Sequence, residues 1–207
     1  MPVENWFPTP IYYHDFPEED WQRINKQIKD RYLDGINLSE IDMWKPDGSG
    51  QVFTTYDYNK GTNIIAEKKF RALNFHIMDQ VGKYLEEVNW KAEKIHIGNS
   101  WINIGTKGSI IQGHHYHGYG VGFDQISGVY YVDGQADNSH GRIRFLAPHH
   151  IKHPKTFPFG DRIPAEVHYD AKPGRLLLFP SWLMHYVTPI TVSEYHRISV
   201  SFNLTLS

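Results

Sequence analysis

The second half of the chain is a succession of short β-strand patterns with no helical pattern between them. In the last of these, Ile198, Val200, Phe202 and Leu204 alternate with Arg197, Ser199, Ser201 and Asn203. Successive side chains of a strand point to opposite faces, so this alternation predicts a strand with one apolar face and one polar face. Short strands at regular spacing are typical of β-sandwiches and barrels, and about eight of them fit the jelly-roll layout.

The strands expected after residue 94 are short and rich in β-branched and aromatic residues. They cover residues 95–104, 109–117, 126–132, 142–146, 166–169 and 175–179, then a segment that carries His185 and Val187, and finally 197–204. Pro180 ends the apolar segment 175–179, because proline cannot donate a hydrogen bond to a central ladder.

The first 93 residues have a helical character instead. Acidic residues 18–20 favour a helix start, and apolar residues then recur at helical spacing to about Leu33. An apolar stripe from Phe70 to Val88 predicts a second helix, which covers residues 66–88.

Shorter strands are also expected in this part, at residues 11–14 and 51–56, the second within an irregular segment, residues 34–63. A chain of 207 residues can bury a substantial core, and one domain is the expectation.

We therefore predict one domain over residues 1–207 that is mostly β with N-terminal helices. Residues 94–207 form a double-stranded β-helix, the cupin-like jelly roll. Residues 1–93 support it, with the two helices bracing the larger sheet.

The composition argues against several classes of function. A net charge of -2 and a pI near 6.7 give no reason to expect a nucleic acid or a membrane surface as partner. The chain has no cysteine, which excludes disulfides and thiolate metal sites. No apolar run approaches the roughly 18 residues of a transmembrane helix. The N-terminus lacks the basic and apolar regions of a signal peptide, so we expect a cytoplasmic protein.

Three histidines on two predicted strands suggest a metal site. His115 and His117 share one face of a strand, and His185 lies on another strand far along the chain. Three imidazoles that converge in a small barrel would form a facial site for iron, copper, nickel or zinc. Each histidine taken alone is more typical of a surface or core residue, and the joint order of the motifs is what favours a metal.

Arg197 and Ser199 are neighbours on the polar face of the last strand. They present a guanidinium and a hydroxyl to one point, and a planar guanidinium matches a carboxylate in a bidentate manner. This pair predicts a carboxylate-bearing ligand close to the three histidines.

Several runs of the chain match a known family in order and spacing. They are Ser100-Trp101-Ile102-Asn103, His115-Tyr116-His117, Ser127-Gly128-Val129-Tyr130-Tyr131, the run from Pro173 to Pro180, His185, and the run from Arg197 to Asn203. With these runs, residues 99 to 204 resemble the 2-oxoglutarate- and iron-dependent oxygenases, in the prolyl-hydroxylase-like branch often seen in bacteria and phages.

The resemblance implies a role for each matching position. His115 and His185 match the two iron-ligating histidines. Arg197 and Ser199 match the pair that receives the distal carboxylate of 2-oxoglutarate, and Tyr131 matches a tyrosine whose hydroxyl contacts that carboxylate. Asn103, on a neighbouring strand, is also assigned to the co-substrate site.

The resemblance also implies the reaction. The cofactors are iron(II) and 2-oxoglutarate as co-substrate. The enzyme is a dioxygenase that uses O2, hydroxylates an unidentified small molecule or protein side chain, and releases succinate and CO2. Trp182 either lines the substrate entrance or simply packs.

The sequence departs from the family at one ligand position. The usual triad contains two histidines and a carboxylate, and in this chain the carboxylate position holds His117. We take His117 as the third ligand, with Asp124 as the alternative that would complete the triad from a loop. His149, His150 and His153 belong either to a polar surface loop or to a lid over the barrel mouth.

Two other functions stay open at this point. A cupin-like metalloenzyme with three histidines and no 2-oxoglutarate would bind metal but leave Arg197 and Ser199 unexplained. A non-catalytic jelly-roll binding module would not bring the three histidines together.

Overall fold

The structure of the protein is a computed structural model. It describes residues 9–32, 52–56, 63–106, 115–117, 124–135, 141–148, 166–190 and 196–207. The expected loop residues 149, 150 and 153 and most of the irregular segment 34–63 therefore lie outside the described residues.

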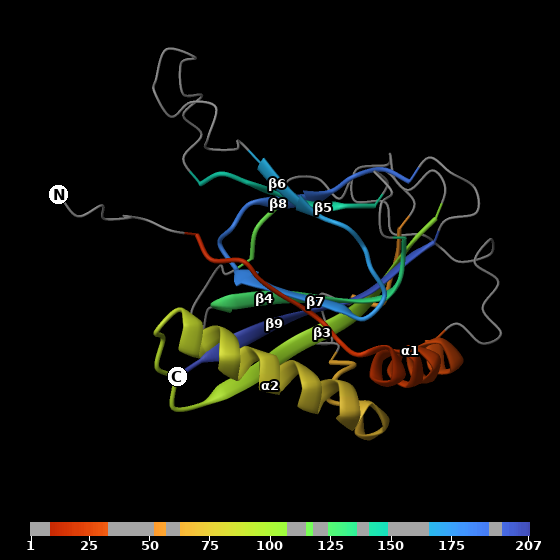
Figure 1. Ribbon diagram of the computed structural model, residues 1–207, viewed down its shortest axis with the longest axis horizontal. Coiled ribbons are helices and arrows are strands. Elements are labelled where there is room, and N and C mark those ends of the chain that lie inside the picture. Colours follow the sequence, from red (N-terminus) through yellow and green to blue (C-terminus); the bar gives the residue numbers. More distant parts are fainter. Residues whose placement is uncertain are drawn as a thin grey trace, which may run out of the picture.

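Two antiparallel sheets form the body of the molecule (Figure 1). The larger sheet has the order β1-β7-β4-β9-β3-β2, and the smaller has the order β6-β5-β8. The larger sheet consists of β1 (Tyr12–Asp15), β2 (Val52–Thr54), β3 (Ile95–Gly105), β4 (Ile126–Asp133), β7 (Arg175–Pro180) and β9 (Arg197–Leu206). The smaller consists of β5 (Ile143–Leu146), β6 (Glu166–Tyr169) and β8 (His185–Val187). The mostly β fold class predicted from the sequence is confirmed.

Two helices cover the face of the larger sheet that is turned away from the smaller sheet (Figure 1). They are α1 (Glu18–Tyr32) and α2 (Arg71–Glu87), and a short 3-10 turn, η1 (Lys68–Phe70), precedes α2. The acidic first turn and basic last turn of α1 complement the helix dipole. The predicted bracing of the larger sheet by N-terminal helices is confirmed.

The alternation of the strands divides the core into two parts. Val200 and Phe202 of β9 pack on the helix side of the larger sheet, together with Ile24 of α1 and Ile77 of α2. Leu177 of β7 faces the other way, into a second cluster between the two sheets. Tyr131 of β4 and Phe145 of β5 belong to that cluster too. The space between the sheets is therefore where polar side chains of β3 and β9 can meet a ligand.

Two expected strands differ in detail. Pro180 is the last residue of β7 rather than the residue after it, which a strand end tolerates because no further ladder bond is needed. Of the strand expected at 109–117, only residues 115–117 are described, and His115 forms an isolated bridge with His185.

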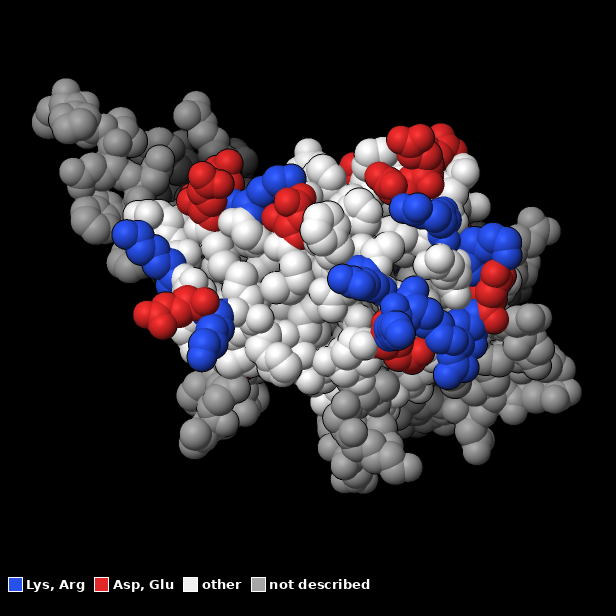
Figure 2. All heavy atoms as spheres, turned by 90° about the horizontal axis from the view of Figure 1, so that it is seen from below, with Lys and Arg blue, Asp and Glu red and all other residues white. Residues whose placement is uncertain are grey.

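Charges of both signs lie side by side on the face formed by the helices (Figure 2). The pairs Lys26–Asp30 and Lys83–Asp79 each join neighbouring turns of one helix. Within the described residues, neither helix combines the length and hydropathy that a membrane-spanning helix requires.

Candidate metal and co-substrate site

Backbone pairing brings His115 and His185 together. The amide of His115 donates to the carbonyl of His185 at 3.0 Å, and the amide of His185 donates to the carbonyl of His115 at 3.0 Å. The two ring centroids are 4.3 Å apart. A ladder pair of this kind fixes both Cα positions, so the two imidazoles are placed by the sheet itself.

His117 joins them from the same short segment. Its amide donates to the carbonyl of Ser181 at 2.8 Å. Its ring centroid lies 5.2 Å from that of His115 and 5.4 Å from that of His185. One nitrogen from each of the three rings lies within 4.8 Å of the others, which makes this a group that could hold one metal ion.

The hydrogen bonding of His185 prepares one nitrogen for a metal. Its Nδ1 lies 2.8 Å from the carbonyl oxygen of Leu183, which can only accept. Nδ1 therefore carries the proton, and the lone pair is left on Nε2. Metal-ligating histidines commonly have their second nitrogen fixed in this way.

Burial keeps two of the imidazoles neutral. Burial, with a smaller contribution from the neighbouring His115, lowers the pKa of His185 to about 3. Burial likewise lowers the pKa of His117 to about 4, again with a contribution from His115. Neutral rings at physiological pH retain the lone pairs that a metal ion needs.

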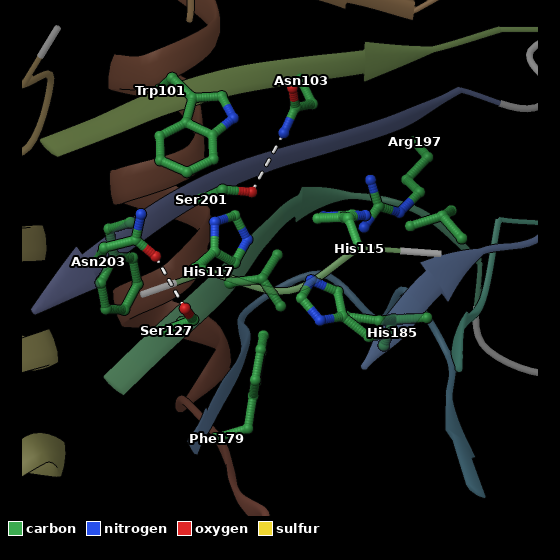
Figure 3. A pocket seen from close by; sticks show the side chains of 15 residues that line it. Trp101, Asn103, His115, His117, Ser127, Phe179, His185, Arg197, Ser201 and Asn203 are labelled. Atoms are coloured by element: carbon green, nitrogen blue, oxygen red, sulfur yellow. Dashed lines mark hydrogen bonds between the residues drawn. The ribbon is translucent and has the colours of Figure 1, made fainter. Parts of the chain in front are cut away.

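Arg197 lies beside this group as a buried cation. Its side chain is 5% exposed and lines the same cavity, of about 50 Å³, as the three histidines. Figure 3 shows Arg197 on the side of His115, and Ser127 and Asn203 on the side of His117. Among the described residues no carboxylate pairs with Arg197.

The groups around Arg197 leave two buried polar atoms without partners. Its Nη1 donates to the hydroxyl of Ser199 at 3.0 Å, and the guanidinium lies over the ring of Tyr131, 5.1 Å from the centroid. Within the described part of the chain, neither Nε of Arg197 nor the hydroxyl of Tyr131 has a hydrogen-bond partner. Leaving such groups unpaired costs about 1–3 kcal/mol each, so a ligand that accepts from both would stabilise this arrangement.

Asn103 lines the cavity but is engaged with a neighbour. It is 4% exposed and donates from Nδ2 to the hydroxyl of Ser201 at 3.1 Å (Figure 3). On the other side of the site, the hydroxyl of Ser127 donates to Oδ1 of Asn203 at 2.8 Å. These four polar side chains line the same cavity as the three histidines.

Asp124 is not a member of the histidine group. Its Oδ1 accepts a hydrogen bond from the hydroxyl of Thr205 at 3.3 Å. Within the described residues, the group that could hold a metal contains the three histidines and no carboxylate.

Some lining residues were not singled out by sequence reasoning. The ring centroid of Trp101 lies 6.2 Å from that of His117, and the ring centroid of Phe179 lies 4.9 Å from that of His185. Ser201 and Asn203 share the polar face of β9 with Arg197, and this alternation was the signal that could have identified them. Trp101 and Phe179 carry no such signal, because apolar residues on a buried strand are normally core.

A comparison with protein families matches the part of the chain that contains the three histidines and Arg197. A family model described as "Putative 2OG-Fe(II) oxygenase" matches residues 99–203. This segment contains most of β3 and β9 and every residue of the site. A search of the curated proteins finds no match.

Solved structures with a similar fold cover nearly the whole chain. A prolyl-4-hydroxylase from Pseudomonas putida has 15% identity and a TM-score of 0.60, and the alignment covers 96% of this chain and 94% of that one. HygX from Streptomyces hygroscopicus, solved with nickel and 2-oxoglutarate bound, has 13% identity and a TM-score of 0.58 over 96% and 83% of the two chains. A viral collagen prolyl hydroxylase from Paramecium Bursaria Chlorella virus-1, in a 2-oxoglutarate complex, has 13% identity and a TM-score of 0.56 over 95% and 96%. At these identities the likeness establishes the fold, which is the double-stranded β-helix expected from the sequence.

Proposed function

The chain belongs to the 2OG-Fe(II) oxygenase family, and from this premise we propose which of its residues carry the family's chemistry. His115, His117 and His185 hold iron(II). Arg197, Ser199 and Tyr131 receive the distal carboxylate of 2-oxoglutarate, and Asn103 borders the co-substrate from β3.

The donor set supports the iron assignment. Three imidazoles whose nitrogens converge form a donor set that suits iron, as it also suits other first-row transition metals. The bond from His185 to the Leu183 carbonyl fixes which nitrogen of that ring faces the ion. An iron(II) ion held by these three histidines would still need further ligands, which 2-oxoglutarate and O2 would supply.

The observation that carries the co-substrate assignment is the buried, unpaired guanidinium of Arg197. A charge on a side chain that is only 5% exposed is normally paired, because an isolated ion in the protein interior is costly. A carboxylate placed at this point accepts from Arg197 Nε and from the Tyr131 hydroxyl, which have no other partner among the described residues. The unpaired guanidinium also argues against a three-histidine metalloenzyme that uses no carboxylate-bearing co-substrate.

The protein's own residues position the co-substrate and keep water away from the metal-binding histidines. Arg197 orients the co-substrate through its carboxylate, while the apolar rings of Trp101 and Phe179 exclude water from the histidines. When bound, iron(II) supplies the chemistry that couples decarboxylation of 2-oxoglutarate, to succinate and CO2, to oxidation of a substrate C–H bond. The expected reaction is hydroxylation of a substrate that the family does not specify.

His117 changes the electrostatics of this centre. A neutral histidine in place of the usual carboxylate would leave the metal centre, the ion together with its ligands, with one more unit of positive charge. We infer that this strengthens the attraction of the 2-oxoglutarate carboxylates for the metal. Asp124, the alternative third ligand considered from the sequence, lies outside the group of three histidines and accepts a hydrogen bond from Thr205.

Two further expectations accompany this function. The cytoplasmic location and the absence of a nucleic-acid partner stay predictions from the sequence. The division into a supporting part, residues 1–93, and a core, residues 94–207, is likewise a proposal.

A turnover assay tests the assignment. Purified protein with iron(II), O2 and 2-oxoglutarate should release succinate, and His185→Ala should abolish this release. Arg197→Ala should raise the 2-oxoglutarate concentration needed for half-maximal rate by about a hundred-fold, because a buried charge partner is lost. The matched control is Arg23→Ala, which removes an exposed guanidinium that pairs with Asp20. An unchanged 2-oxoglutarate requirement in Arg197→Ala would contradict the co-substrate assignment even if metal binds.

A further inference from the structure

A groove opens beside the metal site, where the C-terminal end of α2 approaches the end of β7. It has a volume of about 440 Å³, and His117 reaches it from the side of the metal site. Its apolar walls come from elements far apart in the sequence: Tyr84, Val88 and Trp90 at the end of α2, and Pro180 and Trp182 after β7. A cavity of this size falls in the range that binds small molecules.

Two tryptophans in this groove present their rings to the surface. Trp182 is 54% exposed and Trp90 is 43% exposed, which places both among the large apolar side chains that the fold leaves uncovered. Because they lie in one concave surface next to His117, they are better explained as a binding surface than as isolated exposed residues.

Asp124 gives the groove a negative charge. Asp124 is one of the lining residues, and its Oδ1 accepts a hydrogen bond from the neutral hydroxyl of Thr205 at 3.3 Å. Burial raises the pKa of this carboxyl group. Among the described residues that line the groove there is no lysine or arginine. Among the described residues no ion pair with Asp124 is found.

We propose that this groove binds the substrate that the iron site oxidises, and that the substrate is a small molecule carrying an ammonium group on an apolar stem. The assignment as substrate rests on the proposed function. The ammonium group pairs with Asp124, and the aromatic faces of Trp90 and Trp182 attract the same positive charge. The stem lies along the apolar walls toward His117, which brings its C–H bonds to the metal site.

The charge of a ligand should decide how tightly the groove binds it. A carboxylate-bearing ligand of the same length would meet the charge of Asp124 with no lysine or arginine among the described lining residues to offset it. A neutral ligand would gain the apolar contacts and lose the pairing with the carboxylate. An alkylammonium ion gains both, so the three classes should bind in a fixed order.

Binding can be tested without metal or 2-oxoglutarate, so that it does not depend on catalysis. The full chain, freed of metal, is titrated with n-hexylamine, hexan-1-ol and hexanoate while tryptophan fluorescence is followed. Hexylamine should bind about ten-fold more tightly than hexanol, as expected for one charge-assisted hydrogen bond, and hexanoate should bind most weakly.

Two variants locate the effect. Asp124→Asn keeps the shape of the side chain and should reduce hexylamine binding to the level of hexanol, with hexanol unchanged. Asp79→Asn removes an exposed carboxylate on α2 that pairs with Lys83 and should leave the ten-fold preference intact. Equal affinity for the three ligands in the unmodified protein, or an undiminished preference in Asp124→Asn, would overturn the proposal.

A second measurement connects the groove to the iron site. With iron(II), O2 and 2-oxoglutarate present, hexylamine should increase the rate of succinate release, and Asp124→Asn should remove the increase. Binding of the amine with no effect on succinate release in an active enzyme would overturn its role as substrate. Absence of any succinate release would contradict the proposed function itself, whereas the fluorescence titration alone decides the preference for a cation.

Discussion

His115 and His185 exchange both of their backbone hydrogen bonds, each at 3.0 Å, although they come from distant parts of the chain. This pairing sets their rings 4.3 Å apart by strand geometry and not by the conformation of a flexible loop. The third ring, that of His117, follows two residues after His115 and is anchored by its amide to Ser181. The β-scaffold itself therefore brings together the three histidines of the proposed metal site.

Tyr131→Phe separates ligand binding from stability. The Tyr131 side chain is fully buried and its hydroxyl has no partner among the described residues. Removing this hydroxyl should leave the ligand-free protein as stable as before, or stabilise it by about 1 kcal/mol. The same change should weaken 2-oxoglutarate binding about ten-fold, because a hydrogen bond to the carboxylate is lost. Urea unfolding and a 2-oxoglutarate titration measure the two effects, and a destabilised variant with normal 2-oxoglutarate binding would show that the hydroxyl is structural.

His117→Asp restores the usual ligand set. We expect the variant to retain iron, because an aspartate can replace the imidazole as a ligand. The ion together with its ligands then carries one unit less positive charge. The dissociation constant for 2-oxoglutarate should therefore rise at least about ten-fold. Anaerobic titration of the iron-loaded variant measures this constant. Tighter binding of 2-oxoglutarate by His117→Asp would contradict the proposed electrostatic role of the third histidine.

Asp15 fastens β1 to the start of β7, and its contribution should depend on pH. It accepts hydrogen bonds from Arg175 at 2.7 and 2.9 Å, and these bonds lower its pKa from 3.8 to about 2 although burial opposes the shift. Because the folded-state pKa is depressed, the stabilisation is present above about pH 4 and is lost as the pH falls toward 2. At neutral pH, Asp15→Asn should lower the free energy of unfolding by about 1 kcal/mol, after allowance for partial exposure to solvent.

Urea unfolding at pH 7, 4 and 3 checks this expectation. The difference between the unmodified protein and Asp15→Asn should shrink as the pH falls. Asp30→Asn, which breaks an exposed pair with Lys26, should change stability by less than about 0.5 kcal/mol at each pH. A gap between Asp15→Asn and the unmodified protein that widens toward acid would contradict the assignment.

Gly128 and Phe202 face each other across β4 and β9. A Cβ atom at Gly128 would overlap the ring of Phe202, which is fully buried. Gly128→Ala should therefore destabilise the protein by about 1–3 kcal/mol through overpacking. Gly82→Ala is the matched control, because no atom lies within 4 Å of a Cβ built at this helical position, and it should be neutral or stabilise the protein by about 0.5–1 kcal/mol.

The combination of Gly128→Ala with Phe202→Leu tests the mechanism. Since the smaller side chain relieves the overlap, the double variant should be more stable than the sum of the single changes predicts. Strict additivity of the two free-energy changes would mean that the glycine is needed for another reason.

Much of the architecture could be predicted from side-chain periodicity. The alternation in residues 197–204 identified β9, and the apolar stripe from Phe70 to Val88 identified α2, although the helix expected over 66–88 starts earlier than α2 and includes the short turn η1. What periodicity does not contain is pairing between distant segments. The neighbours β1 and β7, or β3 and β9, are joined by contacts across long stretches of chain, and no local pattern specifies them.

Parts of the candidate site could be proposed from the sequence because their residues carry unusual chemistry. Three histidines and the Arg197 and Ser199 pair stand out because imidazole and guanidinium groups are uncommon on buried strand faces. Trp182 was noted as a candidate for the substrate entrance and does line the groove. Trp90 could not be predicted, because it lies in a turn after α2 and reaches the groove only through the packing of that helix against the sheet.

Crystals grown without oxygen, with iron(II) and 2-oxoglutarate, test the central claim most directly through anomalous diffraction at the iron absorption edge. We predict a single strong peak within bonding distance of one nitrogen each of His115, His117 and His185. We also predict density for 2-oxoglutarate whose distal carboxylate contacts Arg197 and Tyr131. An iron peak elsewhere, or a co-substrate that binds with Arg197 left unpaired, would contradict the claim.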